Sequence, residues 1–236
     1  MTRKQPTKPK RKKTKSSDEA FSDLGFAKVD LEREQRCGLP EVIFSEGKTP
    51  KQVVDIAKTL HRNGQPILAT RVDKKTGKAF IKAFPRATFH EHARLAIHGT
   101  LPKGRGTISI CCAGTSDLPV AEEAALCAEY FGNTVHRCYD IGVAGLHRLL
   151  SHLSEIKKSH VIITVAGMEG ALPSVVGGLV DKPMIAVPTS IGYGANMQGL
   201  TTLCGMLTSC SSGVTVVNID NGFGAAYAAT QITRLL

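Results

Sequence analysis

The C-x-x-C motif is missing from this chain, which has seven cysteines. An odd number of cysteines does not suit a disulfide framework, and the common structural zinc sites need closely spaced pairs. The sequence therefore argues against both kinds of crosslink. It favours a reducing compartment, in which most of the thiols pack as small buried side chains.

Long apolar segments are missing as well. No run approaches the roughly 20 apolar residues that a transmembrane helix needs, and the opening segment lacks the apolar stretch of a secretory signal. We therefore expect a cytoplasmic protein that does not contact a membrane. A G-x-G-x-x-G fingerprint is also absent, so a standard dinucleotide-binding fold is not indicated.

The net charge of +10 is concentrated at one end of the chain. Eight of the 30 lysines and arginines lie within residues 1–15, which hold no acidic residue, and the remaining 22 nearly balance the 20 acidic residues. Such a run can be a nuclear address or a nucleic-acid patch, but its composition favours a solvated tail. We interpret residues 1–20 as a disordered basic tail and do not expect nucleic acid as a partner.

Residues 21–105 have the pattern of a small N-terminal α/β domain. Thr49 followed by Pro50 is a strong helix start, and Asn63-Gly64 is a typical helix end. The segment PKGRG (residues 102–106) is the expected joint to a second domain. The other expected elements are a short helix at residues 21–25, strands at 41–44 and 66–72, and a turn at 73–77.

Residues 106–236 alternate between short β-branched runs and helical stretches, which predicts a parallel sheet with helices on both faces. We expect a flavodoxin-like doubly wound sheet. The expected strands are residues 107–112, 134–140, 161–166, 184–188 and 214–219. The expected helices are residues 118–131 and 146–158, two near 168–180 and 196–210, and a last one at 223–236.

Gly-rich loops follow several of the predicted strands, and ligands of such sheets bind outside the carboxyl ends of the strands. A loop of Gly and Ala exposes backbone N–H groups and lets a ligand come close. The loop after the first strand, AGTSDLP, also opens a helix and could bind an anion there. Asp117 could bind a ribose hydroxyl or simply cap that helix. The candidate binding residues are Gly114, Thr115, Ser116, Asp117, Gly167, Gly192, Tyr193 and Gly194.

Four further side chains could carry chemistry. Arg148 could bind a phosphate bidentately and His147 could act as an acid or base, although the two could equally be a structural pair. Glu169, in AGMEGALP, is a candidate general base because it stands among Gly and Ala after a buried strand; its alternative role is to cap the next helix. Cys210, in SCSSG, could be a nucleophile or a buried filler.

The motifs GTSDLPVAEEAA, DIGVAGLHRLL, VAGMEGALPSVVGGL, VPTSIGYGANMQGL and SCSSGVTVVNIDNGFGAA together resemble the LarB family of nickel pincer cofactor biosynthesis. The segment DLEREQRCGLPEVIFSEGKT resembles the N-terminal part of the same family. The resemblance begins at about residue 21 and covers nearly everything except the basic tail.

Residues 106–236 also resemble, more distantly, PurE, the catalytic subunit of phosphoribosylaminoimidazole (AIR) carboxylase. This chain has GLHR where that enzyme typically has SAHR, and AGMEGALP where it has AGGAAHLP. It thus lacks the second histidine and carries Glu169 instead. These departures argue against AIR as the substrate.

The LarB resemblance implies a carboxylase/hydrolase that acts on nicotinic acid adenine dinucleotide. The expected products are pyridinium-3,5-biscarboxylic acid mononucleotide and AMP. Cys210 matches the family's SC-x-SG position and becomes the expected nucleophile, so its sulfur should reach the pyridinium ring of a nucleotide bound at the AGTSD turn. Glu169 is the first candidate for removing the proton at C5, and His147 is the second.

The remaining expectations concern what the enzyme binds. We expect no organic cofactor; a magnesium ion held by phosphates and by Asp140 or Asp220 is a candidate. The expected ligands are a nucleotide and CO₂, and both resembled families form symmetric oligomers, often octamers. The alternatives are an AIR carboxylase or mutase and, from another class, a non-catalytic nucleotide- or nucleic-acid-binding module that uses the basic tail.

Overall fold

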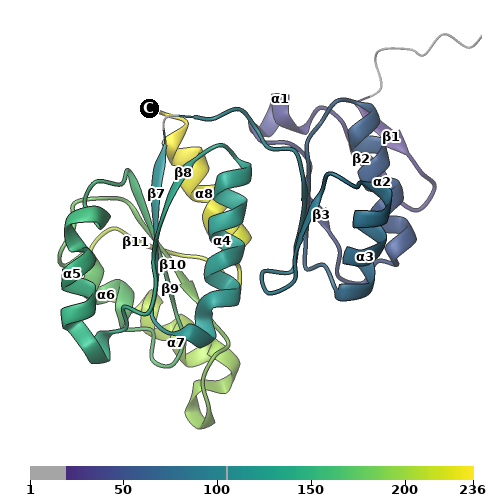
Figure 1. Cartoon of the computed structure of the whole chain (residues 1–236). Helices are drawn as coiled ribbons and strands as arrows, with labels where there is room; N and C mark the ends of the chain where they lie inside the picture. Colours follow the sequence, from purple (N-terminus) through teal and green to yellow (C-terminus); the bar gives the residue numbers. More distant parts are fainter. Residues whose placement is uncertain (1–19, 105) are drawn as a thin grey trace, which may run out of the picture.

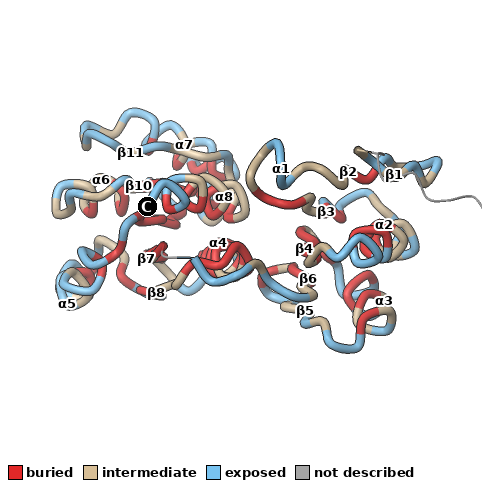
Figure 2. Tube along the Cα trace, turned by 90° about the horizontal axis from the view of Figure 1, so that it is seen from above, coloured by how far each residue is buried: buried red, intermediate tan, exposed pale blue. Residues whose placement is uncertain are grey.

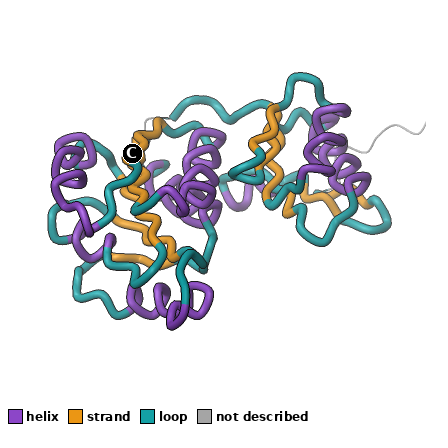
Figure 3. Tube along the Cα trace, turned by 60° about the horizontal axis from the view of Figure 1, so that its bottom comes forward, coloured by secondary structure: helices purple, strands orange, loops and turns teal. Residues whose placement is uncertain are grey.

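The computed structural model describes residues 20–104 and 106–236. The basic tail predicted at residues 1–20 therefore lies outside the described residues, apart from Ala20. Two bodies of sheet and helix lie side by side, and the chain passes from the first to the second between His98 and Thr107 (Figure 1). In both bodies the helices pack on the outside of the strands (Figure 3).

The C-terminal part contains a five-stranded parallel sheet with the strand order β11-β10-β9-β7-β8. The first strand in the chain lies between the second and the third, which is the 2-1-3-4-5 order of flavodoxin-like folds. The predicted fold is therefore confirmed. The strands are β7 (Thr107–Cys112), β8 (Thr134–Cys138), β9 (Val161–Ala166), β10 (Met184–Pro188) and β11 (Val214–Val216).

Helices cover both faces of this sheet (Figure 2). On one face are α4 (Leu118–Tyr130) and α8 (Gly222–Thr233); on the other are α5 (Leu146–Ile156), α6 (Leu172–Gly177) and α7 (Leu200–Leu207). Side chains of a strand alternate between faces, so Ile163 of β9 packs under α4 and α8 whereas its neighbour Ile162 packs on the opposite side.

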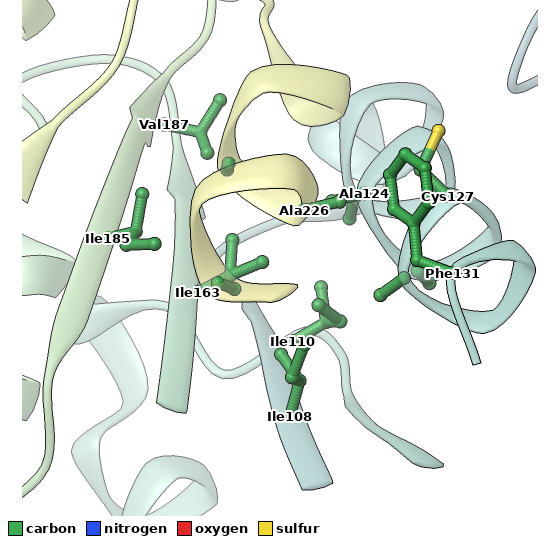
Figure 4. Close-up of a cluster of buried hydrophobic side chains, with 14 of the residues drawn as sticks. Ile108, Ile110, Ala124, Cys127, Phe131, Ile163, Ile185, Val187 and Ala226 are labelled. Carbon is green, nitrogen blue, oxygen red and sulfur yellow. The ribbon is translucent and has the colours of Figure 1, made fainter. Parts of the chain in front are cut away.

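The core under α4 and α8 combines branched strand residues with small helix residues. Ile108, Ile110 and Ile163 face α4 and α8, which meet them with Ala124 and Ala226 (Figure 4). Because alanine leaves little bulk between backbones, the two helices approach each other and the sheet closely. This packing holds the start of α4, and with it the loop after β7, in a defined position.

The N-terminal part has a mixed four-stranded sheet with the order β3-β4-β6-β5 and a separate β1-β2 hairpin. Thr49 caps α2 as expected, in a capping box with Gln52. The elements are β1 (Phe21–Asp23), β2 (Lys28–Asp30), α1 (Arg33–Cys37), β3 (Ile43–Phe44), α2 (Pro50–Arg62), β4 (Ile67–Thr70), α3 (Lys74–Ala83), β5 (Thr88–His90) and β6 (Leu95–His98).

Two predictions for this part are wrong. Residues 21–25 do not form a helix, because Gly25 turns at φ 80° and folds Phe21–Asp23 back against Lys28–Asp30. Residues 73–77 do not form a turn, because Asp73 accepts a hydrogen bond from the Thr76 amide and starts α3. Gly77 stands inside that helix because a Cβ there would lie 2.6 Å from the Phe89 ring.

The C-terminal helices are confirmed; three end within three residues of the predicted ends, and the other two are much shorter than predicted. The helix expected near residues 168–180 spans only Leu172–Gly177. The helix expected near residues 196–210 is divided into the 3₁₀ segment η3 (Gly194–Gly199) and α7, because Met197 and Gln198 adopt left-handed conformations that an α-helix cannot contain. Two more 3₁₀ segments, η1 (Thr115–Asp117) and η2 (Val143–Gly145), precede α4 and α5.

The two parts share buried contacts. Leu68 and Leu95 of the N-terminal sheet belong to the same apolar cluster as Tyr130 of α4, and the Tyr130 hydroxyl donates to the Pro66 carbonyl at 3.0 Å. Arg71, just after β4, reaches further and donates to the Asp220 carbonyl. The N-terminal part is thus packed against α4 and the loop after β11. In the described residues no helix is long and apolar enough to cross a membrane.

Candidate functional site

A cavity of about 400 Å³ lies at the carboxyl ends of β7, β8 and β9. Its walls are the loops that follow these strands, together with Ile191 from the loop after β10. The strand order reverses between β7 and β9, and open α/β sheets bind ligands at this reversal. Of the predicted binding and catalytic residues, Gly114, Thr115, Ser116, Asp117, Asp140, Arg148, Gly167 and Glu169 line the cavity.

Asp117 is buried, and its two carboxylate oxygens organise the loop after β7. Oδ2 accepts the Gly114 amide at 3.1 Å, and Oδ1 accepts the Thr189 hydroxyl at 2.6 Å. Burial raises the pKa of Asp117; these two hydrogen bonds act in the opposite direction, and Asp220 nearby raises it further. The carboxylate does not bond the first amides of α4, so the helix-cap alternative for this residue is not realised. The exposed side chains of Thr115 and Ser116 stand beside it at the cavity.

Asp140 and Arg148 form an ion pair on the second wall, with Oδ2 and Nη1 separated by 2.5 Å. Asp140 follows β8 in a left-handed conformation (φ 57°), which aims its side chain at the start of α5. Arg148 folds back over Gly145, where a Cβ would lie 2.7 Å from its Nε. This pair places a cation at the cavity while a carboxylate neutralises part of its charge.

Glu169 stands on the third wall, in the loop after β9. Its side chain is exposed, and in the described part of the chain no hydrogen bond or ion pair holds its carboxylate. It does not cap α6, whose first amides have no side-chain partner, so the capping alternative is not realised. The site therefore has a free carboxylate in the same cavity as the AGTSD loop.

Residues further along the chain hold the Glu169 loop in place. The carbonyl of Met168 accepts hydrogen bonds from Asn196 Nδ2 at 2.9 Å and from Thr202 Oγ1 at 2.5 Å, and its amide donates to the Ile191 carbonyl at 2.8 Å. Met168 is left-handed (φ 52°), a conformation that costs free energy unless the surroundings enforce it. Asn196 and Thr202 enforce it here, and sequence reasoning missed both, as it missed Thr189.

Four predicted site residues lie near the cavity but do not line it. His147 is exposed on the first turn of α5, next to Arg148. Gly192, Tyr193 and Gly194 belong to the exposed loop beyond Ile191, and the Tyr193 side chain is 81% accessible to solvent. Their predicted roles stay predictions.

Cys210 is exposed in the loop between α7 and β11, and it does not line the cavity of its own chain. Its neighbour Ser209 shares a 2.7 Å hydrogen bond with Ser174 of α6. Because Cys210 precedes β11, it lies toward the amino ends of the strands, whereas the cavity lies at their carboxyl ends. The chain by itself therefore does not bring the expected nucleophile to the AGTSD loop.

The two carboxylates considered for a magnesium ion are both engaged. Asp140 pairs with Arg148, and Asp220 accepts the Ser190 amide at 2.8 Å through its Oδ1. Asp140 lines the cavity and Asp220 does not. Among the described residues, the grouping of side chains that could ligate a metal lies elsewhere, at Cys138, His152 and Glu155.

The fold and the cavity define a flavodoxin-like α/β protein with a ligand site at the reversal of its sheet. Residues 21–100 match the family model described as the LarB/PurE-like N-terminal domain, and residues 107–236 match the model described as AIR carboxylase. The chain belongs to the LarB family, with a PurE-like AIR carboxylase domain in its C-terminal half.

Curated relatives are similar either to most of the chain or to a shorter stretch of it. An uncharacterized protein of Methanocaldococcus jannaschii is 40% identical over 219 residues, which cover 89% of this chain and 84% of the relative. N5-carboxyaminoimidazole ribonucleotide mutases are similar over a shorter stretch. Those of M. jannaschii and Pyrococcus horikoshii are 35% and 33% identical over 133 residues, which cover 54% and 53% of this chain and 79% and 71% of the relatives.

Proposed function

We propose that this protein carboxylates C5 of the pyridinium ring of nicotinic acid adenine dinucleotide and splits its phosphoanhydride, giving pyridinium-3,5-biscarboxylic acid mononucleotide and AMP. One observation carries the choice of substrate. The cavity is lined both by the free carboxylate of Glu169 and by the AGTSD loop, and Glu169 lies in the segment where the AIR carboxylase pattern has a histidine. The chain also matches a LarB/PurE-like N-terminal domain over residues 21–100, whereas the similarity to the mutases covers little more than half of the chain.

The charges of the lining support a pyridinium substrate. Glu169 brings to the cavity a carboxylate that no cation of the described residues neutralises, and this charge favours a cationic ring. Arg148 and the hydroxyls of Thr115 and Ser116 are suited to bind a phosphate or ribose at the other end of the nucleotide.

The reaction needs a nucleophile because a pyridinium ring is electron-poor and cannot attack CO₂. When a thiolate adds to C4, the ring becomes a dihydropyridine, and its C5, now an enamine carbon, attacks CO₂ and forms the new C–C bond. Glu169 then takes the C5 proton, and the C–S bond breaks as the ring regains its aromaticity, so the thiolate leaves with its electron pair. In a separate step, water hydrolyses the phosphoanhydride bond of the dinucleotide and releases AMP.

Cys210 is the proposed source of the thiolate, and we place it in the cavity of a second copy of the chain. The outer face of α7, next to Cys210, is apolar and exposed, with Leu200 46% and Leu207 63% accessible to solvent. An apolar helix face of this kind is suited to bury itself against another subunit. A homo-oligomer would bring Cys210 to the cavity of a second copy and would also bury the apolar face of α7. The expected state is an octamer, and light scattering after gel filtration measures its mass.

The direct test is to incubate the purified protein with nicotinic acid adenine dinucleotide and bicarbonate and to determine the masses of the products. We expect AMP and a dicarboxylated mononucleotide. Finding neither product with a correctly folded oligomer would overturn the proposal. Cys210→Ser and Glu169→Gln should each abolish carboxylation, whereas Cys37→Ser, which removes a half-buried thiol at the end of α1, should retain it.

Mixing the two inactive variants tests the origin of the sulfur. If Cys210 and Glu169 of one site come from different copies, co-expressed Cys210→Ser and Glu169→Gln chains rebuild some complete sites and recover part of the activity. If both residues come from one chain, no complete site forms and the mixture stays inactive. Loss of this complementation would refute the shared site while leaving the substrate assignment intact.

Magnesium dependence is tested separately. A magnesium ion on the phosphates would need Asp140 to leave Arg148, or water to bridge the two. Activity is measured after chelation and again after adding Mg²⁺. Restoration by the ion would support its role, whereas full activity in excess chelator would remove it. We propose no organic cofactor, because the ring carries the chemistry once the thiolate has added.

An AIR carboxylase or mutase is the second candidate, favoured by the similarity to the N5-carboxyaminoimidazole ribonucleotide mutases. Rescue of a purine auxotroph by this chain, together with failure to convert the dinucleotide, would select it. A nucleic-acid-binding role for the tail makes a different prediction: deleting residues 1–15 should abolish binding of nucleic acid and leave turnover intact.

A further inference from the structure

We propose that Cys138, His152 and Glu155 form a binding site for a zinc ion, separate from the cavity. Their donor atoms, a thiol sulfur, an imidazole nitrogen and a carboxylate oxygen, all lie within 4.8 Å of one another. Ligands around a tetrahedral zinc ion lie roughly 3.5 Å apart, since Zn–S and Zn–N bonds are roughly 2.0–2.3 Å long, so the donors are near the spacing that an ion needs. Small movements of side chains would close the site around an ion.

The fold assembles these donors from two elements. Cys138 ends β8, the edge strand of the sheet, and His152 and Glu155 lie three residues apart on one face of α5, which packs against β8 (Figure 2). His152 occupies the same stripe of α5 as the buried residues Leu149 and Ile156. It thus stands where an apolar residue would normally pack, pointing toward the thiol.

The three proposed ligands differ in their exposure to solvent. Cys138 is buried, His152 is half-buried and Glu155 is exposed. An ion can therefore enter from solvent beside Glu155 and reach the sulfur at the margin of the core. In the described part of the chain, no hydrogen bond engages the His152 ring, so its nitrogen is available as a ligand.

The donor set selects the metal. Magnesium and calcium prefer oxygen ligands only, whereas zinc combines thiolate, imidazole and carboxylate. Binding would form one S–Zn bond and release the thiol proton to solvent, and water would fill the fourth position. The absence of C-x-x-C therefore excludes only closely spaced sites, because these donors lie far apart in the sequence.

The carboxylate of Glu155 already has a hydrogen-bond partner. His136 Nδ1 lies 2.9 Å from Glu155 Oε1, and a hydrogen bond of this kind orients a carboxylate that ligates zinc. An ordinary His136–Glu155 ion pair would explain these two side chains. It does not explain why a half-buried imidazole and a buried thiol converge on the same carboxylate.

The position of the site gives it a structural consequence. The carboxyl end of β8 leads to Asp140, and the amino end of α5 carries Arg148, the ion pair at the cavity. A zinc ion joining β8 to α5 would clamp together the two elements that carry this pair. The proposal does not depend on the substrate of the cavity, so metal binding and turnover can be tested independently.

The test uses the full chain without an affinity tag, freed of metal and kept reduced. Titration with Zn²⁺ in a calorimeter should show about one ion per chain, and Co²⁺ should give the near-ultraviolet band of a cobalt–thiolate bond. His152→Gln should weaken Zn²⁺ binding at least about tenfold, and Cys138→Ser should remove the cobalt–thiolate band. Cys204→Ser and His92→Gln, which remove an exposed thiol and an exposed imidazole elsewhere, should bind like the parent chain.

Two results would overturn the proposal. One is a parent chain that binds no Zn²⁺ at micromolar concentrations; the other is a cobalt–thiolate band that survives Cys138→Ser and disappears in Cys204→Ser. If Cys138→Ser fails to fold because that side chain is buried, the half-buried His152→Gln decides, because unchanged Zn²⁺ affinity in that variant excludes the site.

Discussion

Thr189, the residue after β10, donates a 2.6 Å hydrogen bond to Oδ1 of Asp117, in the loop after β7. Both residues are buried, and β9 lies between their strands in the sheet. The bond therefore connects the loop after β7, which lines the cavity, to the loop after β10. The other carboxylate oxygen of Asp117 accepts a hydrogen bond from the Gly114 amide, so the same side chain also fixes the start of the loop after β7.

Replacing Thr189 with valine tests this link. Thr189→Val keeps the shape of the side chain but leaves one carboxylate oxygen of Asp117 buried without its donor. We expect a loss of about 1–3 kcal/mol in the free energy of unfolding and weaker ligand binding at the cavity. Thr164→Val on β9 is the matched control, because the Thr164 hydroxyl is buried without a hydrogen-bond partner. Denaturant unfolding should show that variant as stable as the parent or more so, and equal losses in both would contradict the link.

The pH dependence of stability should report on Asp117. Burial raises the pKa of this carboxyl in the folded state, so the folded chain holds the proton more tightly than the unfolded chain. The contribution of Asp117 to the free energy of unfolding is therefore greatest at acid pH. It is lost as the pH rises from the pKa of Asp117 in the unfolded chain through its higher pKa in the folded chain. Asp117→Asn should remove this decline, which urea unfolding at a series of pH values can measure. Asp55→Asn serves as the control of opposite sign, because a bond from Lys51 lowers the pKa of Asp55.

Arg71 should stabilise the contact between the two parts of the chain. Its Nε lies 3.9 Å from Oε1 of the buried Glu123, and burial raises the pKa of that carboxyl while Arg71 lowers it. Arg71→Gln leaves the carboxylate buried without its cation, so we expect a loss of about 2 kcal/mol near neutral pH. The loss should shrink as the pH falls and Glu123 takes up a proton.

The control for Arg71 is Lys74→Gln, which removes an exposed ion pair with Glu91. Exposed pairs contribute only about 0–1 kcal/mol, so this variant should unfold nearly like the parent. A double-mutant cycle of Arg71→Gln with Glu123→Gln measures the coupling of the buried pair. A coupling near zero would show that Arg71 acts through the Asp220 carbonyl alone.

Two glycines of the cavity should respond differently to an added methyl group. At Gly167 a Cβ would meet the Ile191 carbonyl and would lie 2.7 Å from Thr189 Oγ1, so Gly167→Ala should push apart the loops after β9 and β10. At Gly114 the nearest heavy atom would be Asp117 Oδ2 at an ordinary 3.6 Å. We expect Gly167→Ala to lower the melting temperature and Gly114→Ala to keep it while weakening binding in the cavity. Thermal unfolding and a ligand titration separate the two effects, and equal stability of both variants would refute the close approach at Gly167.

Local pattern was sufficient for the C-terminal sheet. The runs at β7, β9 and β10 are rich in apolar and β-branched residues because these strands are buried on both faces, and their boundaries match the predicted ones. Local pattern did not predict the secondary structure where a single hydrogen bond or backbone conformation determined it. The bond from Asp73 to the Thr76 amide started a helix at an expected turn, and the left-handed Met197 divided an expected helix.

By itself the sequence determined the doubly wound fold and the edge of the sheet at which Asp117, Arg148 and Glu169 meet. The alternation of strands and helices sets the topology, and in this topology the loops after the strands lie together at the carboxyl ends of the sheet. Only the tertiary structure decided that Cys210 lies outside the cavity of its own chain and that Thr189, Asn196 and Thr202 hold the loops. It alone also brought Cys138 to His152. Such pairings join residues far apart along the chain, and their distances depend on how helices pack on the sheet, which no local pattern encodes.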